Sequence, residues 1–139
     1  MHLSSILDIG SEFVAEAKNG DFTALIQLFD ARVKGWGKTM AHEEEMTVGL
    51  FSDLVYEIPS YCAFDMVDSA VDICMQQTSF DGFNCALDLI ASLVIKSNTT
   101  EVPEKLRAAF PEILVKSKRF GGEPVDICTL IRGHYRNTL

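Results

Sequence analysis

The stretch that decides the fold covers residues 83–114, FNCALDLIASLVIKSNTTEVPEKLRAAFPEIL. Apolar residues in its first half recur every three or four positions, which is the period of an amphipathic helix. The polar segment SNTTEVP at 97–103 interrupts this pattern, and a second helical pattern follows it. The expected inward positions on both sides of the turn are Phe80, Phe83, Leu87, Ile90, Ala91, Val94, Leu106, Phe110, Ile113 and Leu114. Two apolar-faced helices joined by a short turn predict an antiparallel helical hairpin.

The same helical period runs through nearly all of the chain, and no segment shows the alternation of a β-strand. NGD at 19–21, GWG at 35–37 and Pro59 interrupt it, because glycine ends helices and proline constrains the residue before it. Pro111 falls inside the sixth helix, so we expect a kink or a split there. Helices are expected over residues 3–18, 22–34, 40–58, 60–77, 80–96 and 124–136. The sixth helix, before the last of these, is expected to have Thr100 as its N-cap and Pro103 in its first turn, and to end at residue 119.

About seven helices joined by short connections predict an all-α fold, stacked as antiparallel hairpins. The 139 residues suit a single helical domain spanning 1–139. AKNGDFTALIQLF at 17–29 resembles the helix-turn-helix units of solenoid repeats, and residues 83–114 resemble a HEAT-like pair. Since the chain has no strict sequence period, the expected architecture is an irregular HEAT-like array or bundle.

The four cysteines are Cys62, Cys74, Cys85 and Cys128, and no two of them form a C-x-x-C motif. Three of them fall on apolar helical stripes, so we expect free, buried thiols in a reducing compartment. The N-terminus lacks a basic region, a long apolar core and a cleavage site, and the apolar run at 89–95 is too short for a membrane span. These features predict a cytoplasmic protein that does not contact the membrane.

Charge is distributed unevenly along the chain, whose net charge is −8. Residues 1–95 hold fifteen Asp and Glu but only four Lys and Arg, whereas residues 96–139 hold five acidic and eight basic residues. No Lys or Arg lies between Lys38 and Lys96, an interval with ten acidic residues. Opposite charges four residues apart stabilise helices slightly, and these central helices lack such pairs. A solvated acidic face or a surface for a basic partner would each explain this pattern.

HEEEM at 42–46 begins the third expected helix and differs from the zinc-binding motif H-E-x-x-H, because position 46 is Met. Glutamates in a first turn complement the positive end of the helix. That role does not explain why acidic residues continue as far as Asp88 without a Lys or Arg among them. A surface for a basic partner explains both the glutamates of the first turn and the acidic residues that follow. The residues predicted to contact such a partner are Glu43, Glu44, Glu45, Asp53, Glu57, Asp65, Asp68 and Asp72.

An enzymatic alternative comes from DMVD at 65–68 with Asp72, which resembles the carboxylate helices of Mg²⁺-dependent all-α pyrophosphohydrolases and prenyl-chain enzymes. That resemblance implies a second carboxylate helix facing the first, and EEE at 43–45 or Asp81 with Asp88 are the available residues. Neither has the spacing that directs two oxygens at one ion, and the interval 39–95 has no basic residue for a phosphate.

Other kinds of site are also without a matching pattern. The chain has no G-x-S-x-G, no cysteine beside a histidine and no P-loop. We therefore expect no catalytic residues, no cofactor and no metal, and we expect a nucleic acid to be repelled by most of the surface. The basic residues of KSKRF at 116–120, with Arg132 and Arg136, are expected to pair with carboxylates inside the fold. Trp36 is either a packing residue or an exposed anchor for a partner.

A small, acidic, all-helical chain without catalytic signals resembles the immunity proteins of bacterial toxin–immunity pairs, including those of contact-dependent growth inhibition. The resemblance covers the whole chain and rests on its size, its stacked hairpins and the acidic segment 43–88. It implies a stoichiometric inhibitor of a toxin domain, and a nuclease toxin would present a basic cleft to the carboxylates. The alternative is an adaptor or regulatory domain that binds a basic peptide or protein.

Overall fold

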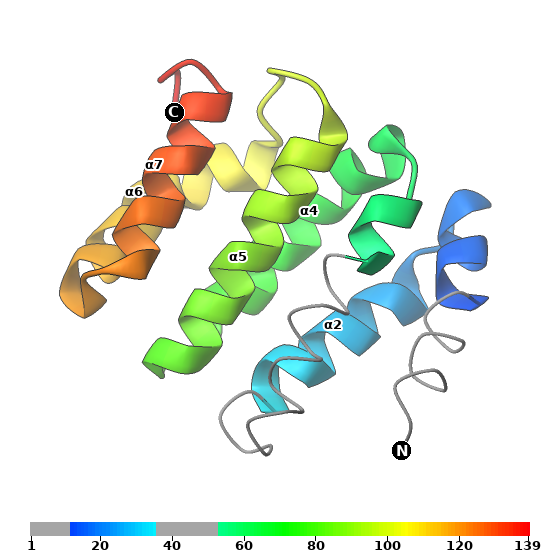
Figure 1. Ribbon diagram of the computed structural model, residues 1–139, viewed down its shortest axis with the longest axis horizontal. Coiled ribbons are helices and arrows are strands. Elements are labelled where there is room, and N and C mark those ends of the chain that lie inside the picture. Colours follow the sequence, from blue (N-terminus) through cyan, green and yellow to red (C-terminus); the bar gives the residue numbers. More distant parts are fainter. Residues whose placement is uncertain (1–11, 36–52) are drawn as a thin grey trace.

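The computed structural model describes residues 12–35 and 53–139, all of whose regular structure is helical (Figure 1). Shorter helical segments cover residues 12–18 and 53–57. No residue in these two ranges forms a strand, so the expected all-α class is confirmed for them. The complete helices are α2 (Thr23–Gly35), α4 (Ser60–Met75), α5 (Phe80–Ser97), α6 (Glu104–Phe120) and α7 (Glu123–His134).

The helices form two layers, with α2, α5 and α7 side by side in one layer and α4 and α6 behind them (Figure 1). The largest interface joins α4 to α5, which are consecutive and antiparallel. The hairpin of α6 and α7 repeats this arrangement beside it. These stacked hairpins confirm the expectation of an irregular helical array, in which each hairpin buries its apolar face against its neighbours.

Contacts between the two hairpins show that equivalent helices run parallel. Near its start, α6 bonds to Asp72 of α4 through Lys105, and eleven residues later it bonds through Lys116 to Gln77, just beyond the end of α4. In the other layer, the ring of His134 at the end of α7 lies 2.9 Å from the carbonyl of Thr99, just beyond α5. A hairpin can therefore stack on the next one without reversing direction, as in solenoid proteins.

The core is continuous through both layers, and α5 contributes the most buried residues to it. The inward positions expected for α5 are buried, with the exception of Phe80, which is 41% exposed. Phe80 is the first residue of α5, and its ring lies edge-on to Phe120, 5.8 Å away, at the end of the array. The helical period alone does not show that a terminal turn extends beyond its neighbours.

Helix ends agree with the local signals at several points and differ at α6. The backbone at Gly20 has a positive φ of 97° after the segment 12–18, and Ser79 caps α5 by accepting the N–H of Gly82 at 3.2 Å. The expected N-cap at Thr100 is wrong, because α6 begins at Glu104 directly after Pro103. The first turn of α6 instead obtains a hydrogen-bond acceptor from α4, which no local pattern could indicate.

Of the kink or split expected at Pro111, the split does not occur, because α6 runs unbroken from Glu104 to Phe120. Proline removes one backbone hydrogen bond, which leaves the carbonyl of Arg107 without its helical partner. Pro111 and Arg107 are both exposed, so water can hydrate that carbonyl. The continuous apolar stripe of α6 on the core side then holds the helix together.

All four cysteines are free and buried, as expected. Burial raises the pKa of the Cys74 and Cys85 thiols to about 12. Within the described ranges, none of the helices combines the length and the apolar character needed to cross a bilayer. Trp36 and the Glu43–Glu45 run lie outside the described residues.

A candidate protein-binding surface

The predicted contact residues that the structure describes lie on two helical elements. Asp53 and Glu57 are exposed on the segment 53–57. Asp65, Asp68 and Asp72 lie along α4, on the side of that helix opposite its buried positions. These five carboxylates therefore belong to two helical elements, and Glu43, Glu44 and Glu45 lie outside the described residues.

The outer stripe of α4 begins with Tyr61 and continues through its three aspartates at helical spacing. The hydroxyl of Tyr61 donates to the carbonyl of Lys18 at 2.9 Å, although the side chain is 59% exposed. Beside it, the thiol of Cys62 donates to the carbonyl of Ala17 at 3.0 Å. These two bonds attach the segment 12–18 to the start of α4.

Further along this stripe, two aspartates hold the first turn of α6. A carboxylate oxygen of Asp68 accepts the backbone N–H of Lys105 at 3.1 Å. The side chain of Lys105 forms an ion pair with Asp72 at 2.8 Å. The side-chain hydrogen bond to Asp72 and the nearby charges of Asp72 and Asp68 raise the pKa of Lys105. The carboxylates also face the positive end of the helix dipole of α6, which favours them there.

Through Lys105, two of the carboxylates of α4 that were predicted to contact a partner already have a hydrogen-bond donor within the fold. The interval 39–95 contains no cation, but the fold brings one from residue 105. One signal in the sequence could have indicated this contact. A lysine in the first turn of a helix is unfavourable with respect to the dipole, so its charge needs a nearby carboxylate.

The expectation that the basic residues of KSKRF, with Arg132 and Arg136, pair with carboxylates is wrong for the described residues. The ion pairs found within the described ranges are Lys34–Asp30 and Lys105–Asp72, which include none of those basic residues. Lys116 instead donates to the carbonyl of Gln77 and lies 5.4 Å from the ring centre of Phe83. Arg132 lies over the ring of Phe110 at 5.6 Å. These cations stabilise the packing of helices and do not neutralise the acidic residues.

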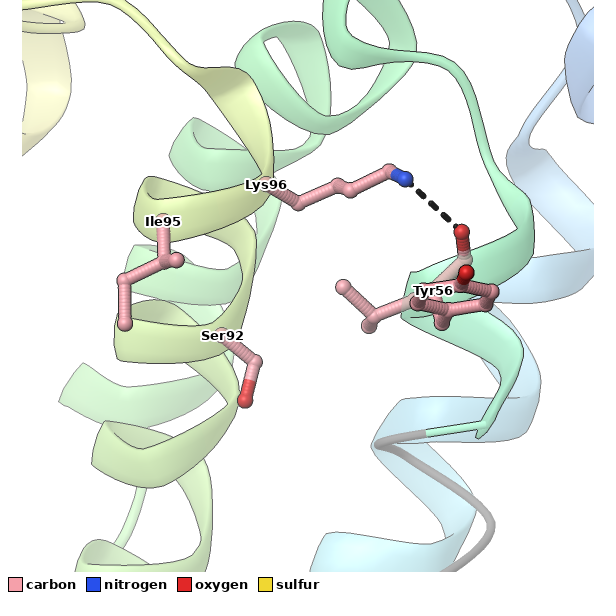
Figure 2. Close-up of a pocket in the computed structure, with 5 residues that line it drawn as sticks. Tyr56, Ser92, Ile95 and Lys96 are labelled. Carbon is pink, nitrogen blue, oxygen red and sulfur yellow. Dashed lines mark hydrogen bonds between the residues drawn. The ribbon is translucent and has the colours of Figure 1, made fainter.

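An open, apolar groove of about 260 Å³ lies between the segment 53–57 and the C-terminal half of α5 (Figure 2). Tyr56 forms one wall, and Ser92 and Ile95 of α5 lie on the other side, as Figure 2 shows. Tyr56 is 78% exposed and Ile95 is 54% exposed. The two largest apolar surfaces of the groove therefore face solvent.

Lys96 connects the two walls of this groove. Its ammonium group donates to the backbone carbonyl of Tyr56 at 2.8 Å and lies 5.0 Å from the centre of the Tyr56 ring (Figure 2). The last carbonyls of a helical segment have no partner within the helix, and Lys96 supplies one here. The contact between cation and ring also restrains the aromatic side chain.

Both elements that form the walls of the groove carry carboxylates close in sequence to the lining residues. Asp53 and Glu57 belong to the same short segment as Tyr56 and are exposed. On α5, Asp88 precedes Ser92 by one turn on the same helix face. Burial and the nearby charge of Glu123 on α7 raise the pKa of Asp88. A cation placed near Asp88 and Glu123 would reduce their mutual repulsion.

The sequence interpretation missed the groove, although part of it could have been found. Leu54 and Val55 of the segment and Ile58 directly after it are buried. Tyr56 lies between them in sequence but on the polar side of the helical period, which indicates an exposed aromatic residue. No sequence pattern indicated that Ile95 would lie opposite it.

Within the described ranges, no group of three or more His, Cys, Asp and Glu is placed to hold a metal ion. Asp68 of the DMVD segment and the following Asp72 both bond to Lys105 in the first turn of α6. Their partner is a lysine, whereas the enzymatic alternative requires a second carboxylate helix at this place.

Comparison of the chain with protein-family models, with curated proteins and with solved structures found no match.

Proposed function

We propose that this protein binds a basic protein partner and neutralises it, in the manner of the immunity proteins of bacterial toxin–immunity pairs. The observation that carries the proposal is the interval between Lys38 and Lys96, with ten acidic residues and no Lys or Arg. Asp53, Glu57 and Asp65 belong to this interval, are exposed and form no ion pair with a described residue.

A carboxylate surface of this kind suits a nuclease domain as the partner. A nuclease binds phosphates in a basic cleft, and carboxylates can occupy the same positions as phosphate oxygens. The net charge of −8 would also steer a basic domain toward the surface over distances longer than a contact. Such an inhibitor would act in the cytoplasm of the cell that makes the toxin.

The experiment that tests this proposal uses the product of the gene adjacent to its own. If the product of the adjacent gene is toxic, its co-expression with this protein is expected to restore growth. The purified pair is expected to associate at a rate that falls as the salt concentration rises. The triple variant Asp53→Asn, Glu57→Gln, Asp65→Asn should keep the stability of the monomer, since these side chains have no described ion pair, and should associate about tenfold more slowly.

A matched control neutralises three exposed acids of the mixed-charge part of the chain, Glu101, Glu104 and Glu112, to glutamine. This variant should associate at the wild-type rate at every salt concentration. Equal slowing by both triple variants, or association that salt does not affect, would contradict the electrostatic proposal.

A second function is an adaptor domain for a basic peptide, and the groove between Tyr56 and Ile95 favours it. The groove is open and small, and one extended peptide could pass across it. An adaptor should bind several unrelated basic peptides weakly, whereas an immunity protein should bind one folded partner tightly. Affinities measured against a panel of basic peptides and against the neighbouring gene product separate the two functions.

A further inference from the structure

The groove between Tyr56 and Ile95 has the size of a side-chain pocket. Its volume of about 260 Å³ lies below the usual range for small-molecule sites, which begins at roughly 300 Å³. Small-molecule sites also enclose most of their ligand, whereas this groove is open along its length. A single apolar side chain, presented by another macromolecule, matches this shape better than a metabolite does.

The walls of the groove have the composition of a binding hot spot. Tyrosine is enriched among the residues that contribute most to protein–protein affinity, and such residues are often surrounded by polar groups. Tyr56 and Ile95 are two of the most exposed large apolar side chains in the described part of the chain. Burial of these two surfaces by a partner would remove apolar area that the fold leaves in water.

The groove is also held open before any partner arrives. Lys96 fixes the segment 53–57 through the Tyr56 carbonyl and restrains the ring through the contact at 5.0 Å. Both contacts are with uncharged groups, so Lys96 keeps its positive charge, and the cations of a basic partner would have to lie toward the carboxylates and away from Lys96. A preformed site loses less conformational entropy when it binds.

Charge complementarity identifies the kind of partner. The carboxylates nearest in sequence to the walls are Asp53 and Glu57 on one side and Asp88 on the other, with Glu123 close to Asp88. Burial is the larger cause of the raised pKa of Asp88 and the charge of Glu123 is the smaller one, and a partner's cation would offset this second effect. An apolar anchor flanked by basic residues satisfies both the groove and its surroundings.

We infer that the groove between Tyr56 and Ile95 receives one apolar side chain of the basic partner, while Lys or Arg residues on either side of that side chain contact the surrounding carboxylates. The inference rests on the proposed function, because it takes the partner to be basic. It adds a specific anchor, which charge alone does not require.

The test uses short Lys/Arg-rich peptides that differ at one central position, either leucine or serine, with binding followed by fluorescence anisotropy. The leucine peptide is expected to bind at least about tenfold more tightly than the serine peptide, from burial of one aliphatic side chain. Tyr56→Ala removes one wall and Ser92→Phe fills the groove, so both should abolish this difference. Leu130→Ser, at a position on α7 that is 51% exposed, is the matched control and should preserve it.

The outcomes separate the inference from the proposed function. Equal, salt-sensitive binding of both peptides would overturn the groove as an anchor while leaving the acidic surface as a binding site. A leucine preference that persists in both groove variants would place the anchor elsewhere and would also overturn it. Concentration-dependent dimerisation that Tyr56→Ala abolishes would show that a second copy of this chain occupies the groove. If neither peptide binds at low salt, the inference fails, and the proposed function is decided separately by the growth assay.

Discussion

Replacement of Asp68 by alanine tests whether the acidic residues of α4 stabilise the fold. The variant removes the acceptor for the backbone N–H of Lys105 in the first turn of α6, at a bond length of 3.1 Å. Loss of a carboxylate that caps a helix in this way costs about 1 kcal/mol. Relief of repulsion from Asp65 and Asp72 returns only a few tenths of a kcal/mol. For a chain of this length the net loss corresponds to a fall in Tm of about 3 °C.

The assay is urea and thermal unfolding followed by circular dichroism, at low salt and at about 1 M NaCl, where charges are screened within roughly 3 Å. The loss for Asp68→Ala should persist at high salt, because it comes from a direct hydrogen bond. Asp68→Asn retains an acceptor oxygen and should recover part of the stability. Asp72→Asn removes an exposed ion pair and should have a smaller effect that high salt abolishes.

Asp65→Ala is the matched control, since Asp65 lies on the same stripe, is exposed and forms no ion pair with a described residue. It should leave the unfolding free energy unchanged or slightly raised. The reasoning is refuted if Asp65→Ala and Asp68→Ala destabilise the protein equally, or if the loss for Asp68→Ala disappears at high salt. Either result would mean that overall charge, and not attachment of α6, sets the contribution of these residues.

Three further predictions follow from the packing. Cys74 and Cys85 have folded-state pKa values raised to about 12, so their contribution to stability is fully present below the unfolded pKa of 9.0 and is lost as pH rises toward 12. Alkaline titration followed by circular dichroism should show this loss of stability. A thiol reagent at pH 8 should react with these cysteines only after unfolding. Lys116→Met removes the bond to the carbonyl beyond the end of α4 and should cost about 1 kcal/mol in urea unfolding, whereas Lys118→Met, at an exposed position, should change stability by less than about 0.5 kcal/mol. Calorimetric titration with Mg²⁺ or Mn²⁺ should show no micromolar binding, because Asp68 and Asp72 of α4 already bond to Lys105 in the first turn of α6. Micromolar binding that Asp72→Asn abolishes would restore the enzymatic alternative.

Local features of the chain were readable from the sequence because they depend on neighbours within one or two turns. The apolar period located the described helices, and Gly20 and Pro59 marked boundaries at which the backbone must change direction. The inward faces followed from the same period, as at Leu87 and Ile90. The local errors were the inward position of Phe80, the N-cap at Thr100 and the possible split at Pro111. The end of the array, an acceptor on α4 and hydration by water decide these three outcomes.

The candidate binding surface depended on tertiary structure, because its parts come from distant segments. The sequence showed that the interval from 39 to 95 is acidic and without Lys or Arg, but Lys105 reaches two of its carboxylates from 33 and 37 residues away. Lys96 and Tyr56, which define the groove, are 40 residues apart. Helical periodicity specifies which face of each helix is apolar, but the stacking of one hairpin on the next decides which charges meet and which aromatic side chains are left in solvent.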